Sequence, residues 1–221
     1  MSAPDTVEAL LQRARALAGL RLRDVAETLG VPPPHQSRHA KGWSGALLEV
    51  ALGADAGNRP EPDFTRLGVE LKTIPIDARG VPRESTYVCR APGGVRAGLR
   101  WEDSTVRCKL AHVLWLPIES SREPDPASRR IGWARLWQPT PAEDAVLRAD
   151  WEELVDLLAT GQRHAISAHL GRWLQLRPKG ADAAERAPAS DESGAPCPMP
   201  PRGFYLRATA TRRILAGEAL A

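Results

Sequence analysis

The chain has 221 residues, of which 43% are hydrophobic, and this is enough to bury a sizeable core as one domain or as two lobes sharing a cleft. No apolar run approaches the roughly 18 to 20 residues that span a bilayer, so we expect a cytoplasmic protein and no membrane contact. The three cysteines are widely spaced, which excludes a disulfide framework, and we expect them to be reduced core residues.

The charged residues are unevenly distributed, although the net charge is only +3. Residues 163–213 contain nine Arg or Lys and four Asp or Glu, whereas residues 140–160 contain six acidic residues and one Arg. We therefore expect the C-terminal third to be the electropositive part. Only four of the 30 basic residues are lysines, at positions 41, 72, 109 and 179, which suggests a specific use for a compact ammonium there.

Three helices are predicted in the N-terminal part. Asp5 or Thr6 can cap a helix that continues to about Ala18. Residues 22–31 resemble the first helix and turn of a helix-turn-helix, but prolines at 32–34 remove the donors that a recognition helix needs. Residues 41–54 are apolar on nearly all sides and predict a buried helix.

Strands and helices alternate in the rest of the chain. We predict strands at 67–75, 85–90, 112–118, 132–138, 173–177 and 203–207. Thr140-Pro141-Ala142-Glu143 is a capping box that begins an acidic helix, which Gly161 can end, and the Pro/Ser-rich residues 186–200 indicate a loop. The expected fold class is mixed α/β (α+β), with helices around one central mixed sheet.

The strand at 67–75 carries opposite charges on one face. Alternation places Val69 and Leu71 on the core side, and Glu70 and Lys72 on the other side with Cα atoms about 6.5 to 7 Å apart. Asp63 comes from the preceding turn, and two carboxylates at one point repel each other unless a cation lies between them. This pattern predicts a Mg²⁺ site at these acids, where Lys72 orients the water that attacks phosphorus.

An ordinary salt bridge on a solvated sheet edge, worth about 0 to 1 kcal/mol, is the alternative for Glu70 and Lys72. Glu49 favours the metal site, because a carboxylate within an apolar helix costs several kcal/mol unless something compensates it. We expect three acids and Lys72 to converge on one cleft, which indicates a metal-dependent phosphodiesterase.

Two other constellations are weaker. His35 and His39 have the spacing of a zinc pair, but the preceding prolines and the lack of a third ligand argue against it. Cys108 and His112 could form a nucleophile and base, but a core cysteine beside a strand histidine is favoured.

Pro62-Asp63 together with Glu70-Leu71-Lys72 resembles the PD-(D/E)xK nuclease motif. The blocks KGWSGALLE, PDFTRLGVELKTIP, RCKLAHVLWLPIE, DWEEL, LQLRPK and PRGFYL resemble, in this order, the MutH family of DNA mismatch-repair endonucleases. The resemblance covers most of the chain. It implies a restriction-endonuclease-like fold, with one nuclease domain over residues 1–221, two lobes around a DNA-binding cleft, a catalytic core at about 41–118 and a DNA-reading part at about 161–213.

The resemblance also implies an activity. Family members nick the unmethylated strand 5′ to the G of hemimethylated GATC sites in double-stranded DNA, need Mg²⁺ and are activated by MutL, and we expect a monomer. Asp63 and Glu70 would bind the metal, Lys72 would position or activate the water, and Glu49 would be a supporting acid. Lys109 matches a lysine that the family needs for activity.

DNA contacts are implied in both grooves. Lys41 and Gly42 match minor-groove contacts, and Tyr87 stands where the family more often has a phenylalanine wedge at a base step. The major groove would be read by Arg177, Pro178 and Lys179, with an arginine on guanine O6 and N7. Tyr205 matches the sensor of adenine methylation.

Two other functions stay open. A GATC-specific type II restriction endonuclease of the same fold would use the same residues. A non-catalytic DNA-binding regulator would rely on residues 22–31 and the basic C-terminal region, and it would need no metal.

Overall fold

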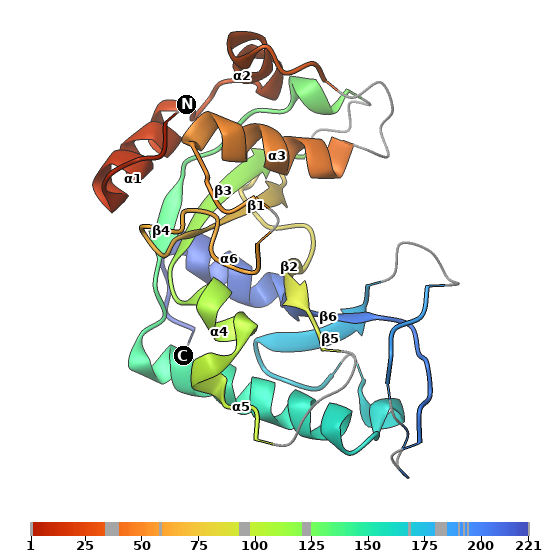
Figure 1. Cartoon of the computed structure of the whole chain (residues 1–221). Helices are drawn as coiled ribbons and strands as arrows, with labels where there is room; N and C mark the ends of the chain where they lie inside the picture. The colour runs from red at the N-terminus through yellow and green to blue at the C-terminus, as the bar shows by residue number, and fades with distance from the viewer. Residues whose placement is uncertain are drawn as a thin grey trace. The chain divides into compact units, whose positions relative to one another are not determined.

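The computed structural model describes residues 2–33, 40–57, 59–92, 98–120, 125–167, 169–179, 185–189, 191, 193 and 195–220, with only the backbone at 40 and 41 (Figure 1). The chain divides into two compact units. Unit 1 comprises Met1–Glu84 and Ala111–Gln138, and unit 2 comprises Ser85–Leu110 and Pro139–Ala221. The single nuclease domain over residues 1–221 stays a prediction.

Unit 1 contains helices α1 (Val7–Ala16), α2 (Leu22–Leu29) and α3 (Ala40–Leu52) and a sheet of β1 (Glu70–Ile76), β3 (Val113–Glu119) and β4 (Arg135–Trp137). The strand order is β1-β3-β4, so β1 lies at an edge. Strands β1 and β3 are parallel, from Glu70 opposite Val113 to Ile76 opposite Glu119, and β4 is antiparallel to β3. The core combines apolar side chains from the three helices with others from β1 and β3.

The predicted N-terminal helices form, but α1 ends at Ala16 and α3 ends at Leu52, each two residues before the predicted end. The Thr6 hydroxyl caps α1 by accepting a hydrogen bond from the Ala9 N–H at 3.1 Å. Gly30 ends α2 with a φ of +66°, a left-handed conformation that suits glycine. Residues 31–33 are not helical, so no recognition helix begins there, and the zinc pair considered at His35 and His39 lies outside the described residues.

Helix α3 buries one face only, although its sequence is apolar on nearly all sides. Leu47, Leu48 and Leu52 lie in the core, whereas Val50 is 47% exposed. The helix packs against α1, α2 and β1. The prediction of a helix buried on all sides is therefore wrong.

Unit 2 contains α4 (Thr105–Leu110), α5 (Pro141–Ala159) and α6 (Ala208–Ala216) with a second sheet of β2 (Thr86–Arg90), β6 (Arg202–Leu206) and β5 (Leu174–Pro178). The strand order is β2-β6-β5 and both pairings are antiparallel. The predicted capping box of α5 is confirmed, because the Thr140 N–H donates to Glu143 Oε2 at 2.7 Å and the Thr140 hydroxyl accepts from the Glu143 N–H at 3.3 Å.

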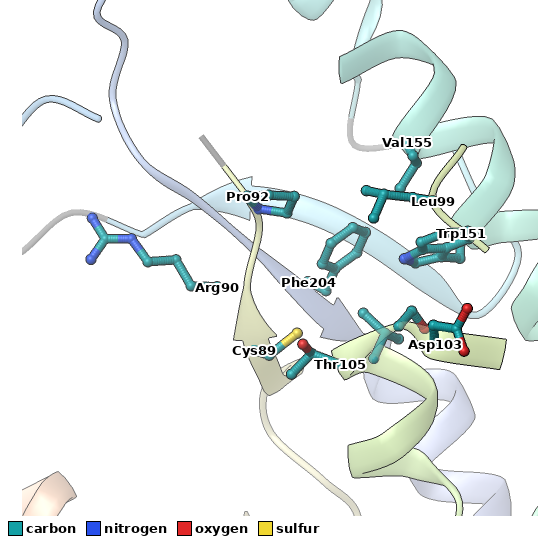
Figure 2. Close-up of a pocket in the computed structure, with 11 residues that line it drawn as sticks. Cys89, Arg90, Pro92, Leu99, Asp103, Thr105, Trp151, Val155 and Phe204 are labelled. Atoms are coloured by element: carbon teal, nitrogen blue, oxygen red, sulfur yellow. The ribbon is translucent and has the colours of Figure 1, made fainter. Parts of the chain in front are cut away.

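A cavity of about 230 Å³ lies within unit 2, beside the second sheet. Phe204 of β6 and Trp151 and Val155 of α5 gather around it, while the Arg90 side chain points away from it (Figure 2). The cavity belongs to the apolar side of this sheet, so the opposite side is the one available to polar residues.

The mixed α+β class is confirmed, but the described strands form two three-stranded sheets where one central sheet was expected. Helices α4 and α6 had no counterpart among the predicted elements. Cys89, Cys108 and Cys197 are free, as expected, but Cys108 is exposed and Cys197 is half-buried, so only Cys89 is a core residue. Within the described residues, no helix has the length and apolarity needed to cross a membrane.

Candidate active site

The turn before β1 places Asp63 beside the start of that strand. Phe64 and Val69 form an antiparallel bridge, in which the Phe64 N–H donates to the Val69 carbonyl at 2.9 Å. Gly68 allows this reversal because its φ is +62°. Asp63 Oδ2 accepts a hydrogen bond from the Leu71 N–H at 2.8 Å, so the carboxylate lies against the first peptide group of β1.

Asp55 holds this turn from the loop after α3. Its Oδ1 accepts from the Thr65 N–H and its Oδ2 from the Thr65 hydroxyl, each at 2.8 Å, and its own N–H donates to the Asp63 carbonyl at 2.9 Å. The bond from the Thr65 N–H is the main cause that lowers the pKa of Asp55. Nothing in the sequence distinguishes Asp55 from other acids in polar loops, so its role emerges only from the structure.

The charged face of β1 is buried. Glu70 is 2% exposed and the Lys72 side chain is 12% exposed, and Lys72 Nζ donates to Glu70 Oε1 at 2.5 Å. The Glu70 N–H donates to the His112 carbonyl at 2.9 Å, which fixes the start of β1. A salt bridge on a solvated sheet edge is therefore wrong for this pair, because little of either side chain reaches water.

Stability alone does not account for the burial of this pair. Taking two charges out of water costs several kcal/mol per ion, and a buried pair is often no better than apolar residues of the same volume. The burial of the pair is thus compatible with a functional role.

Asp63 and Glu70 are the candidate ligands for a magnesium ion. Mg²⁺ is usually held by one or two carboxylates, and waters and substrate phosphates complete its ligands. Asp63 and Glu70 supply two carboxylates from adjoining segments of unit 1. In the described part of the chain, no group of three or more His, Cys, Asp or Glu side chains is placed to hold a metal, so the expected three-acid cluster with Glu49 is not found. Glu49 is half-buried on α3, which packs against β1.

Four side chains predicted to contact DNA meet on one face of the second sheet. Tyr87 on β2 lies opposite Tyr205 on β6, with ring centroids 5.3 Å apart and ring planes at 65°. Lys179 Nζ lies 4.7 Å from the centroid of the Tyr87 ring, and Arg177 Cζ lies 5.6 Å from that of Tyr205. We call Tyr87, Tyr205, Arg177 and Lys179 the tyrosine cluster. Burial is the main cause that raises the pKa of Tyr87.

Two further residues support this cluster. A Cβ on Gly203 would lie 2.9 Å from Tyr87 Cε2 and 3.3 Å from Tyr205 Cε2, so a larger residue there would require the rings to shift. The buried Asp150 carboxylate accepts hydrogen bonds from the N–H groups of residues 172, 173 and 174 at 2.7, 2.6 and 2.8 Å. Asp150 thereby fixes the start of β5, the strand that presents Arg177.

The remaining predicted residues are placed individually. Gly42 is exposed in the first turn of α3, where an added Cβ would meet no described atom within 4 Å, and Lys41 precedes it. Pro178 ends β5 and is exposed, and Lys109 is half-buried in α4 of unit 2. Cys108 lies on the same helix and is exposed, so the expectation of a core cysteine is wrong.

Comparison with known proteins decides the family. The sequence profile described as DNA mismatch repair enzyme MutH matches residues 52–150. The chain is 52% identical over 212 residues to the DNA mismatch repair protein MutH of Shewanella amazonensis, covering 96% of this chain and 95% of the relative. The corresponding protein of Pectobacterium atrosepticum is 50% identical over 214 residues, 97% of this chain and 93% of the relative. That of Escherichia coli K12 is 47% identical over 216 residues, 98% of this chain and 94% of the relative. The chain belongs to the MutH family.

MutH membership confirms the resemblance found from the sequence blocks. The relatives cover nearly the whole chain, so the matched stretch includes segments of both units. The profile match contains Asp63, Glu70 and Lys72.

Proposed function

We propose that this protein nicks the unmethylated strand of hemimethylated GATC sites, 5′ to the guanine, with Mg²⁺ as cofactor. Membership of the MutH family makes it a DNA mismatch repair endonuclease, a hydrolase that acts on DNA. The observation that carries the finer proposal is the buried Glu70–Lys72 pair, with the Asp63 carboxylate against the first peptide of the same strand.

These positions support the following catalytic roles. Asp63 and Glu70 would hold Mg²⁺, which when bound lowers the pKa of a water and offsets charge on the phosphoryl oxygens. Lys72 is held by Glu70 Oε1, so its ammonium is fixed without reorganisation during the reaction, and it would orient the attacking water and stabilise the developing charge. Glu49 and Lys109 would act as supporting groups.

The tyrosine cluster supports the following DNA-reading roles. Tyr87 would insert at a base step, and Arg177 would donate two hydrogen bonds to a guanine, worth about 1 to 3 kcal/mol of discrimination. Lys179 and Pro178 continue the same reading segment. Tyr205 would pack against the adenine N6 group, where a methyl group clashes or removes a hydrogen bond.

Lys41 and Gly42 would contact the minor groove. A glycine within a helix costs about 0.5 to 1 kcal/mol relative to alanine. No described atom would obstruct a Cβ at Gly42, so packing gives no reason for a glycine there. Close approach of a DNA backbone does give one.

The partner and state are part of the proposal. We expect MutL to activate the enzyme, and a monomer in the cytoplasm to be the acting species. Activation by MutL fits a nuclease that must stay inactive until a mismatch has been detected.

Glu70→Ala and Lys72→Ala test the catalytic assignment. Each should abolish nicking of a supercoiled GATC plasmid with Mg²⁺ and MutL, and each should leave duplex affinity nearly intact, since neither residue is assigned to DNA reading. Arg66→Ala, in the exposed turn before β1, is the matched control and should nick normally. Turnover in either β1 variant would contradict the assignment.

Unmethylated, hemimethylated and fully methylated duplexes test the specificity. We expect nicking of the unmethylated strand with MutL, and little reaction on fully methylated DNA. Double-strand cutting without MutL would indicate a restriction enzyme instead. Specific binding with no nick under any condition would indicate a non-catalytic regulator.

A further inference from the structure

A second cavity of unit 2 is lined by three arginines. It has a volume of about 580 Å³ and runs along β5, past the end of β6, to the start of α6. Its lining residues include Arg177, Arg202 and Arg207 together with Ser85, Ser167 and Thr209. None of its described lining residues is Asp or Glu, so the cavity suits an anion.

Of the three arginines that line the cavity, Arg202 would gain the most from a bound anion. It is half-buried at the first position of β6, and burial lowers its pKa. Among the described residues, it takes part in no ion pair. The neighbouring Arg163 is 6% exposed, and its pKa is lowered by burial and then by the charge of Arg202. Two like charges with little water between them are unfavourable, and an anion beside them would offset this cost.

The other end of the cavity is rigid and rich in donors. Arg207 Nε donates to the Gly171 carbonyl at 3.0 Å and its Nη2 donates to the Leu170 carbonyl at 2.7 Å, which fixes the guanidinium. Helix α6 begins beside it without a side-chain cap, and its first residues, Ala208 and Thr209, line the cavity. The first N–H groups of a helix have no partner within the helix and favour negative charge.

We propose that this cavity binds a backbone phosphate of the DNA duplex, with Arg202 as the principal contact; the identity of the ligand rests on the proposed function. Arg177 and Pro178, which would read base edges, line the same cavity. A phosphate held there would fix the register of the duplex against these two residues while carrying no sequence information itself. The size is sufficient, because a water occupies about 30 Å³ of liquid volume and a phosphate group with several waters fits within the cavity.

The first test is the salt dependence of duplex binding. Each neutralised phosphate contributes about 0.9 to the slope of log K against log salt, so Arg202→Met should reduce the slope by about 1. Affinity at low salt should fall by about tenfold, equally for a GATC duplex and a duplex without GATC. Arg202→Lys should restore the slope, because it keeps the charge. Arg212→Met, on an exposed position of α6 outside the cavity, is the matched control. Its duplex affinity and salt slope should change no more than on loss of any surface charge distant from the DNA.

The second test uses inorganic pyrophosphate and the free protein. A ligand that binds only the folded state raises the thermal midpoint in a saturable way. We expect this rise for the unchanged protein and for Arg212→Met, and its loss in Arg202→Met. Comparison of the variants in the absence of anion checks that Arg202→Met is folded.

The outcomes separate this proposal from the proposed function. If GATC nicking fails but the slope change and the pyrophosphate response are found, the function is wrong and the anion site stands. If Arg202→Met changes neither the slope nor the response, the cavity holds only water and the proposal is overturned. A loss confined to GATC duplexes would also overturn it, because Arg202 would then read bases.

Discussion

The ring of Tyr87 contacts the Lys179 ammonium and the Tyr205 ring. Burial raises the pKa of Tyr87 above its ordinary value of 10.0. A phenol with a raised folded-state pKa stays protonated to a higher pH in the folded state than in the unfolded state. Its contribution to stability is therefore present in full below pH 10 and decreases as the pH rises above that value.

Tyr87→Phe tests both properties of this residue. The free energy of unfolding should fall less steeply above pH 10 than in the unchanged protein, as measured by urea unfolding at pH 9, 10 and 11. Duplex affinity should stay within about threefold, because the aromatic face that stacks on a base is kept.

Tyr87→Ala is the contrasting variant. It should lose about 1 to 3 kcal/mol of duplex affinity, the usual value of one base–aromatic contact. Equal affinity of the Phe and Ala variants would show that Tyr87 does not stack on a base.

At the scale of the element, the second sheet depends on the missing side chain at Gly203. Gly203→Ala should push the Tyr87 and Tyr205 rings apart, because its Cβ would lie 2.9 Å from one ring and 3.3 Å from the other. We expect duplex affinity to fall by about tenfold, within the range of one lost stacking contact.

Stability should change less than affinity in this variant, since two rings at the surface of the sheet can move. Gly45→Ala, on α3 where a Cβ meets nothing within 4 Å, is the matched control for thermal stability. An unchanged affinity in Gly203→Ala would mean that the ring geometry is irrelevant to DNA reading.

The turn between α3 and β1 gives a second prediction at this scale. Asp55→Ala removes two hydrogen bonds to Thr65, each worth about 0.5 to 1.5 kcal/mol, and so loosens the segment that carries Asp63. The Mg²⁺ concentration for half-maximal nicking should rise severalfold, as measured by single-turnover rates across a Mg²⁺ titration.

Asp55→Asn separates this positioning effect from simple destabilisation. The amide oxygen can still accept from the Thr65 N–H, so the Mg²⁺ dependence should return most of the way to normal. If Asp55→Ala lowers the melting temperature but leaves the Mg²⁺ dependence unchanged, Asp55 has only a structural role.

Patterns within a few neighbouring residues predicted β1 and the start of α5, but they did not predict α4 and α6. The alternation around Glu70 and Lys72 and the capping box at Thr140 each lie within a few residues, and both are found in the structure. Helix α4 spans only Thr105–Leu110, which is too short for a helical period to show, and α6 follows β6 directly without a capping side chain.

The roles of Gly203 and Asp150 depend on contacts between segments far apart in the sequence. Gly203 is required by Tyr87, and Asp150 binds the backbone at residues 172–174. Neither residue lies in a distinctive local sequence pattern, so their roles cannot be predicted from the sequence alone. The division into two sheets depends on strand pairing in the same way.

At the scale of the whole molecule, each unit is built from two separate stretches of chain. The core of unit 1 takes Leu114, Leu116 and Ile118 from β3, beyond the intervening part of unit 2. A fragment of residues 1–84 should therefore be unfolded, with no dispersed amide resonances and no cooperative thermal transition. A variant that joins 1–84 to 111–138 through a short flexible linker should fold, because it restores the whole core of unit 1. A folded 1–84 fragment would contradict this dependence on β3.

The pairing of Glu70 with Val113 also determines when β1 can join its sheet during protein synthesis. Translation at roughly 5 to 20 residues per second separates these two positions by about 2 to 9 s on the ribosome. Until then Glu70 and Lys72 lie on an unpaired strand. On the catalytic assignment proposed above, the chain therefore gains its reactive strand only after more than half of its length has been made.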